Sequence, residues 1–101
     1  MRLDTSAIAG NDLWETIKNK EGETFYTKRG LPFTYSIRGR ELFTDRRERS
    51  ITESTFNNAL LRLKADADAE GTLQRLNGPR ALNMYGAPYV WAIFAGIGLI
   101  K

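Results

Sequence analysis

Basic side chains gather in one short segment of this 101-residue chain. Between positions 28 and 49 the sequence has seven basic and three acidic residues, a local charge of +4 in a chain whose total is +3. Six of the seven are arginines, whose planar guanidinium makes bidentate phosphate contacts and stacks on bases. The seven are Lys28, Arg29, Arg38, Arg40, Arg46, Arg47 and Arg49. This clustering predicts a surface that binds a polyanion, with DNA or RNA as the first candidates.

The same segment supports a second interpretation. Glu48 lies within the basic run 46–49, so the run carries part of its own counter-charge. Arginine and glutamate together also keep a sheet solvated and protect its edges from pairing. Tyr26 and Tyr35 offer stacking surfaces for single-stranded nucleic acid, although the strand pattern around Tyr35 also fits a core position.

A polar helix is predicted directly after the basic segment. Residues 50–60 read Ser-Ile-Thr-Glu-Ser-Thr-Phe-Asn-Asn-Ala-Leu, and Ser50 with Glu53 forms a capping-box pattern. This stretch resembles the turn and recognition helix of helix-turn-helix repressors of the lactose-repressor type, whose polar side chains face the major groove. That family has a first helix just upstream, where this sequence predicts a strand and a basic loop, so a winged arrangement stays open. The resemblance implies groove-facing roles for Ser54, Thr55, Asn57, Asn58 and Arg62.

Two further blocks carry a resemblance to another family. Gly30–Tyr35 reads Gly-Leu-Pro-Phe-Thr-Tyr, and Gly86–Ile93 reads Gly-Ala-Pro-Tyr-Val-Trp-Ala-Ile. Both are similar to blocks in a family of small uncharacterised bacterial and phage-borne proteins without known activity. The resemblance implies a bacterial or mobile-element origin and supplies no site residue.

The acidic stretch Asp66–Gly71 is similar to the opening of an EF-hand calcium loop. Asp66, Asp68 and Glu70 stand at loop positions one, three and five, followed by glycine at position six. The twelfth position, where a bidentate glutamate is expected, is Asn77. The pattern therefore favours a solvated acidic loop, and we expect neither a metal nor another cofactor.

The residue types needed for most catalysis are scarce. The chain has no histidine and no cysteine, which removes the commonest general base, the commonest metal ligand and every disulfide. Glu15, Glu41 and Asp45 are able to hold Mg²⁺ in principle, but no nuclease-type spacing and no Walker-type glycine-rich loop accompany them. The sequence thus gives no positive indication of an enzyme and no catalytic residue.

A protein-interaction module is the alternative function. It would serve a bacterial or phage system, with homo-oligomerisation one form of it. Tyr85, Tyr89 and Trp91 lie close together near two Pro-containing breaks and could form an aromatic patch there. The same three aromatic residues are equally suited to the core.

The hydrophobic pattern predicts an α+β fold in a single domain, 1–101, with residues 1–10 as a flexible arm. The first predicted elements are a helix at about 12–20 and a three-stranded antiparallel meander at about 24–29, 33–38 and 41–45. A helix opened by the Ser50 capping box follows the meander. The last predicted elements are a short helical stretch near 73–76 and helices starting at Gly78-Pro79 and Ala87-Pro88. The predicted core is Phe33, Ile37, Phe56, Leu60, Leu63, Trp91 and Phe94, and the apolar Leu61 is expected to be covered as well.

The longest apolar run, 84–100, is short for a membrane span and is interrupted by glycine and proline. The N-terminus is not followed by the apolar stretch of a secretory signal. We therefore expect a cytoplasmic protein that does not enter a membrane.

Overall fold

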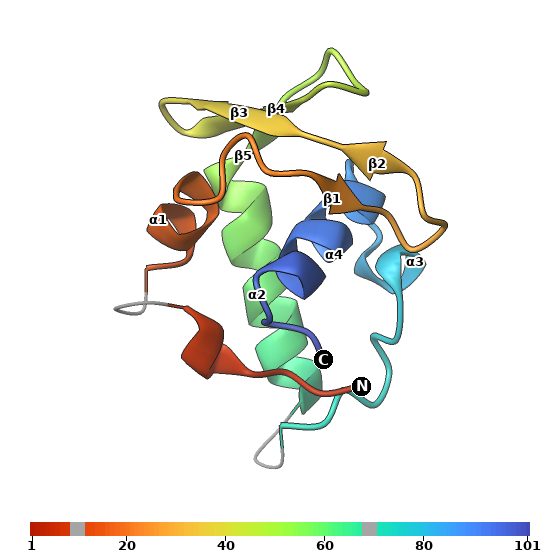
Figure 1. Cartoon of the computed structure of the whole chain (residues 1–101). Coiled ribbons are helices and arrows are strands. Elements are labelled where there is room, and N and C mark those ends of the chain that lie inside the picture. Colours follow the sequence, from red (N-terminus) through yellow and green to blue (C-terminus); the bar gives the residue numbers. More distant parts are fainter. Residues whose placement is uncertain (9–11, 68–70) are drawn as a thin grey trace.

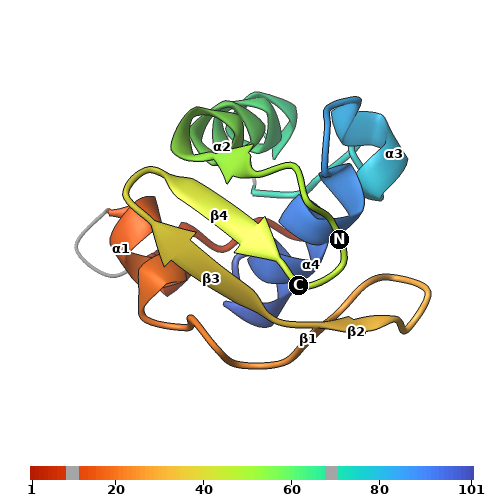
Figure 2. The ribbon, with the colours of Figure 1, turned by 90° about the horizontal axis from the view of Figure 1, so that it is seen from above.

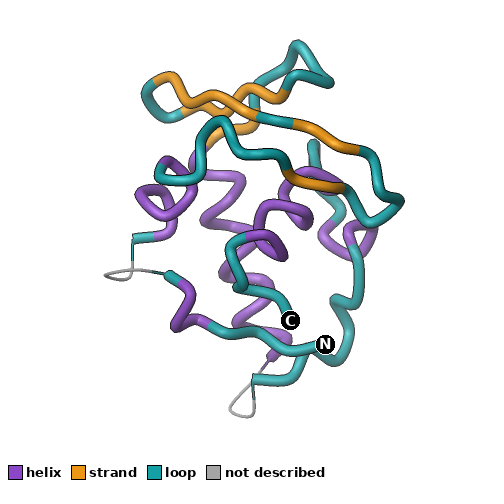
Figure 3. Tube along the Cα trace, in the orientation of Figure 1, coloured by secondary structure: helices purple, strands orange, loops and turns teal. Residues whose placement is uncertain are grey.

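The computed structural model describes residues 1–8, 12–67 and 71–101. Within these residues the fold has four α-helices, one 3-10 turn and two small antiparallel sheets, which confirms the mixed α+β class. In chain order the elements are η1 (Thr5–Ala7), α1 (Leu13–Lys18), β1 (Phe25–Tyr26), β2 (Pro32–Phe33), β3 (Tyr35–Arg38), β4 (Glu41–Thr44), β5 (Ile51–Thr52), α2 (Glu53–Ala67), α3 (Pro79–Leu82) and α4 (Ala87–Gly96). The strands gather at one end of the molecule, above the helices (Figures 1 and 3).

The strands pair differently from the predicted meander. β1 and β2 form a separate two-stranded sheet, while β3, β4 and β5 form the three-stranded sheet. The predicted strand 33–38 is divided at Thr34, whose backbone N–H donates to the side chain of Asp45 at 3.1 Å. Phe33, on one side of this point, pairs with Phe25, and Tyr35, on the other side, pairs with Thr44, so the two residues belong to different sheets. The third strand of the larger sheet is therefore β5 and not residues 24–29.

The turn between β3 and β4 has the predicted two residues, Gly39 and Arg40, since Arg38 is the cross-strand partner of Glu41. Gly39 has a φ of 62°, a left-handed conformation that glycine adopts without a steric penalty. Figure 2 shows the β3–β4 hairpin from above, with α2 along one side of it.

The start of α2 corrects the predicted capping box. Ser50 does not cap this helix, because its hydroxyl donates to Glu41 at 2.7 Å. Residues 51 and 52 are drawn into the sheet as β5, and the hydroxyl of Thr52 accepts from the N–H of Thr55 at 3.4 Å. A cap at Ser50 predicts a helix from residue 51, so the sheet moves the helix start by two residues, to Glu53.

The core lies between α2, α4 and the sheets. Phe56, Leu60 and Leu63 are buried on one face of α2, as their spacing predicts. The predicted core residues Phe33, Trp91 and Phe94 are buried as well. Two expectations fail: Ile37 is only half-buried, since it lies next to the exposed hairpin turn, and Leu61 is 62% exposed on the outer face of α2.

The two ends of the chain lie side by side (Figure 1). Arg2 and Lys101 exchange two backbone hydrogen bonds of 2.7 and 2.8 Å, and Asp4 N donates to Leu99 O at 2.7 Å. Leu3 and Ile8 are buried. Residues 1–8 are therefore tied to the C-terminal segment where the sequence predicts a flexible arm, while positions 9–11 lie outside the described residues.

The later helices begin as predicted. Gly78 is the N-cap of α3 with proline in its first turn, and Gly86 is the N-cap of α4, again with proline in its first turn. The helical stretch predicted near 73–76 is not formed. The backbone N–H groups of Gln74, Arg75 and Leu76 instead donate hydrogen bonds of 2.9 to 3.0 Å to the side chain of Asp66.

Candidate nucleic-acid interface

The seven basic residues of segment 28–49 are all exposed and form two groups. The loop group lies on the β1–β2 and β4–β5 connections and consists of Lys28, Arg29, Arg46, Arg47 and Arg49. The turn pair, Arg38 and Arg40, lies at the opposite end of the β3–β4 hairpin (Figure 1). Five of the cations thus lie on two loops, and the other two lie at the hairpin turn.

Each of the two loops of the loop group is held by a side-chain hydrogen bond to another part of the fold. Arg46 donates its Nε–H to the carbonyl of Pro32 at 3.0 Å, which holds the β4–β5 loop against β2. Lys28 Nζ donates to the carbonyl of Asn77 at 3.4 Å, which ties the β1–β2 loop to the segment before α3. Each of these bonds uses one donor of a side chain that has three or more, so both side chains keep donors for an anion.

Two of the acidic residues in this segment accept hydrogen bonds from neutral groups. Glu41 accepts from the hydroxyl of Ser50, and Asp45 accepts from the N–H of Thr34. Among the residues that the structure describes, Arg40 is the one member of the seven that forms an ion pair, with Glu53 at 3.5 Å. The three carboxylates of the segment, Glu41, Asp45 and Glu48, keep their charges, so the segment retains the net charge of +4 that its sequence gives.

Two arginines lie over aromatic rings. The guanidinium carbon of Arg49 lies 4.1 Å from the ring centre of Tyr85, and the hydroxyl of Tyr85 donates to the carbonyl of Arg49 at 3.1 Å. The guanidinium carbon of Arg38 lies 5.7 Å from the ring centre of Phe43. A guanidinium held in this way loses less conformational freedom when it binds a ligand.

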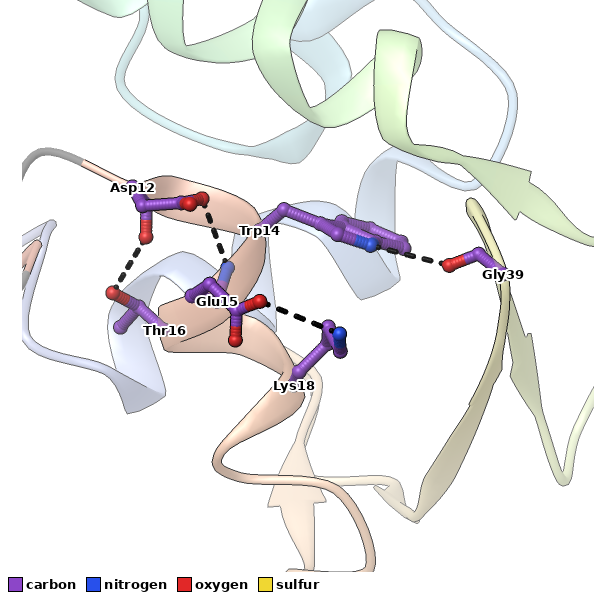
Figure 4. Close-up of polar contacts among 6 residues, drawn as sticks. All are labelled: Asp12, Trp14, Glu15, Thr16, Lys18 and Gly39. Carbon is purple, nitrogen blue, oxygen red and sulfur yellow. Dashed lines mark hydrogen bonds and ion pairs between the residues drawn. The ribbon is translucent and has the colours of Figure 1, made fainter.

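The hairpin turn is held in place by α1. The indole N–H of Trp14 donates to the carbonyl of Gly39 at 3.3 Å (Figure 4). Asp12 caps this helix by accepting from Glu15 N at 3.1 Å, and Glu15 also pairs with Lys18. The buried ring of Trp14 therefore fixes the position at which the turn pair is presented.

The outer face of α2 adjoins the turn pair. The ion pair between Arg40 and Glu53 joins the turn to the first turn of α2, and Asn57, four residues later, lies on the same side of the helix as Glu53. Asn57 and Asn58 are both exposed. Arg62 instead ties α2 to α3, because its Nη1 donates to the carbonyl of Leu82. The strand β5 directly precedes α2, so the chain has no helix at the place where helix-turn-helix proteins have their first helix.

The aromatic patch of the alternative function does not form as predicted. Trp91 is buried, and the ring of Tyr89 packs edge-on against Phe33 with ring centres 5.0 Å apart. Tyr85 remains exposed as the partner of Arg49. Sequence reasoning missed that pair because 36 positions separate its two residues and no local pattern connects them.

The calcium-like loop is only partly described, since residues 68–70 lie outside the described part of the chain. Its first residue, Asp66, accepts hydrogen bonds from three backbone N–H groups. These bonds lower the pKa of the carboxyl, and the bond from Leu76 has the largest effect. The acids considered for Mg²⁺, Glu15, Glu41 and Asp45, bind separate partners. In the residues described, no three acidic side chains gather as a metal site.

No helix in the described part of the chain is both long enough and apolar enough to cross a membrane. Comparisons of the chain with protein-family models, with curated proteins and with solved structures give no match.

Proposed function

We propose that this protein is a small nucleic-acid-binding domain that uses the loop group and the turn pair to contact phosphates. The observation that carries the proposal is the set of seven exposed cations in a segment whose net charge is +4. Phosphate affinity arises from several converging cations that release counterions on binding. A cytoplasmic location agrees with such a ligand.

In this proposal the β3–β4 hairpin and α2 make different contacts with the nucleic acid. The β3–β4 hairpin acts as a wing whose tip carries Arg38 and Arg40, and the Arg40–Glu53 ion pair sets that tip beside α2. Asn57 and Asn58 follow on the exposed face of the helix, where amide groups are able to hydrogen-bond base edges. Phosphate contacts position a protein on nucleic acid and base contacts add sequence preference.

The proposal is tested by replacing Arg29, Arg38 and Arg47 with glutamine in one variant. Glutamine keeps polarity and much of the length, so the fold is expected to survive and the melting temperature to stay near that of the wild type. Each lost phosphate contact makes the slope of log affinity against log salt shallower by about 0.7 to 0.9. We expect weaker binding of labelled oligonucleotides and a slope shallower by about two to three.

A matched variant replaces three exposed cations outside the two groups, Lys18, Lys64 and Arg80, with glutamine. It removes the same charge from α1, the C-terminal half of α2 and α3. Binding close to wild type in this control supports a localised interface. The proposal is wrong if the wild type binds no duplex DNA, single-stranded DNA or RNA at about 50 mM salt, where phosphate contacts are strong. The interaction-module alternative then replaces it.

A further inference from the structure

Two exposed tyrosine rings adjoin the loop group. Tyr26 on β1 is 62% exposed, and Tyr85, under the guanidinium of Arg49, is 37% exposed. The other tyrosines have structural roles: Tyr35 is 3% exposed, and Tyr89 packs on Phe33. Tyr26 and Tyr85 therefore offer aromatic surface to a ligand. Tyr26 ends the strand that leads to Lys28 and Arg29, and Tyr85 lies against Arg49.

The position of Tyr26 follows from the pairing of β1 and β2. Phe25 and Phe33 are cross-strand partners that are both buried, so the next pair, Tyr26 and Pro32, faces outward. Arg46 donates to the carbonyl of Pro32 at 3.0 Å. This bond places a guanidinium at the strand pair that carries the exposed ring.

A hollow of about 420 Å³ lies beside Pro32 and Arg46. It is lined by Thr24, Pro32, Phe33, Thr34, Asp45 and Arg46. Its polar groups include both hydrogen-bond donors and acceptors, as the edge of a base requires. One oxygen of Asp45 accepts from Thr34 N, and a carboxylate has capacity for further donors such as an exocyclic amine.

We infer that the ligand is single-stranded nucleic acid, with bases stacked on Tyr26 and Tyr85 and one base edge in the hollow. The inference rests on the proposed function and names its ligand class. In a duplex the faces of the bases are covered by their neighbours, whereas a single strand exposes them to aromatic rings. The five cations of the loop group hold the phosphates between the stacked bases.

The test compares labelled single strands of thymidine or uridine with duplex DNA of the same length, about 12 units, within the site sizes of such binders. We expect tighter binding of the single strands. Tyr26→Leu and Tyr85→Leu each weaken that binding about five- to a hundred-fold. Tyr26→Leu leaves the salt slope unchanged, because no charge is removed, whereas Tyr85→Leu also removes the ring that holds Arg49. Tyr26→Phe keeps the stacking surface and is expected to bind like the wild type.

Leu61→Ala is the matched control for loss of an exposed apolar side chain, since Leu61 is as exposed as Tyr26, at 62%. We expect this control to bind single strands like the wild type. An Asn57→Ala, Asn58→Ala variant tests the other reading, in which α2 binds a duplex. If the tyrosines carry the contact, this variant is expected to weaken single-strand binding less than Tyr26→Leu does.

Three results would overturn the inference. If duplex binds as tightly as single strands and the tyrosine variants bind normally, while the arginine variant is weakened, the inference falls and the proposed function stands. Loss of duplex affinity in the asparagine variant, with normal binding by the tyrosine variants, assigns the contact to α2. Binding to phosphatidylglycerol vesicles without binding to any oligonucleotide rejects both the inference and the proposed function.

Discussion

The phenolic O–H of Tyr35 donates a hydrogen bond of 2.6 Å to the backbone carbonyl of Ile17. Tyr35 begins β3 and Ile17 lies in α1, so this buried bond joins the N-terminal helix to the larger sheet. The ring of Tyr35 also lies 5.4 Å from that of Phe25, measured between ring centres. Tyr35 is therefore a core residue that positions α1 under the hairpin, and its ring is not available for stacking with a ligand.

Tyr35→Phe removes this bond and keeps the ring. The carbonyl of Ile17 then loses a buried donor, and we expect the free energy of unfolding to fall by about 1 kcal/mol. Urea denaturation of the variant and the wild type measures the difference. An unchanged midpoint would show that the carbonyl finds another donor at no cost.

The same residue predicts an alkaline effect. Burial, with Glu23 and Glu21 adding to it, raises the pKa of Tyr35 well above its ordinary 10.0. Because the fold favours the neutral phenol, this stabilisation is present below pH 10 and is lost as the pH rises beyond it. Thermal melts from pH 9 to 12 are expected to show a steeper loss of stability in the wild type than in Tyr35→Phe. Parallel curves for the two proteins would contradict the prediction.

Gly96 ends α4 where it meets the ring of Phe25. A methyl group at this position would overlap Cδ2 and Cε2 of that ring, which packs against Phe33 and Tyr35 and cannot move freely. We expect Gly96→Ala to lower the free energy of unfolding by about 1–3 kcal/mol through overpacking. Adding Phe25→Leu provides space, so a double-mutant cycle in urea is expected to show coupling between the two sites. Strictly additive effects would mean that the methyl group is accommodated elsewhere.

Phe94 is fully buried in α4, with its ring centre 6.1 Å from that of Phe56. Phe94→Ala removes a core ring and is expected to cost about 3–5 kcal/mol, a large part of the about 5–15 kcal/mol that stabilises a domain of this size. Phe94→Leu keeps most of the volume and is expected to remain folded with a lower melting temperature. A thermal melt unchanged by Phe94→Ala would show that α4 is peripheral to stability.

The ion pair between Asp4 and Lys101, with Nζ and Oδ2 2.6 Å apart, predicts an acid effect. Hydrogen bonds from Lys101 and Ser6 lower the pKa of Asp4 from 3.8 to about 2. A lowered carboxyl pKa stabilises the fold above pH 3.8, and this contribution is lost as the pH falls toward 2. We expect Lys101→Gln to raise the pKa of Asp4, measured by NMR titration, and to lower the melting temperature at pH 7. The difference in melting temperature between wild type and variant is expected to disappear near pH 2. If it is as large there as at pH 7, the ion pair is not its cause.

Several features follow from short stretches of sequence. The spacing of Phe56, Leu60 and Leu63 is enough to identify the buried face of α2, because helix geometry repeats over three to four residues. Gly39 predicts the tight turn because few other residues adopt a left-handed backbone there. The prolines that open α3 and α4 likewise act through local sterics. Charge clustering in segment 28–49 is also a property of sequence alone.

Tertiary structure decided the pairings between distant segments. Residues 51 and 52 carry a helix-start pattern, yet Leu42 pairs with Ile51 and makes this segment a strand. Arg62 has the position of a groove-facing residue, yet its guanidinium is bound to the carbonyl of Leu82. Arg49 meets Tyr85 only because the loop before α4 returns to the sheet. Such contacts depend on which distant groups the packed core brings within a few ångströms, a choice that short-range sterics and periodicity do not encode.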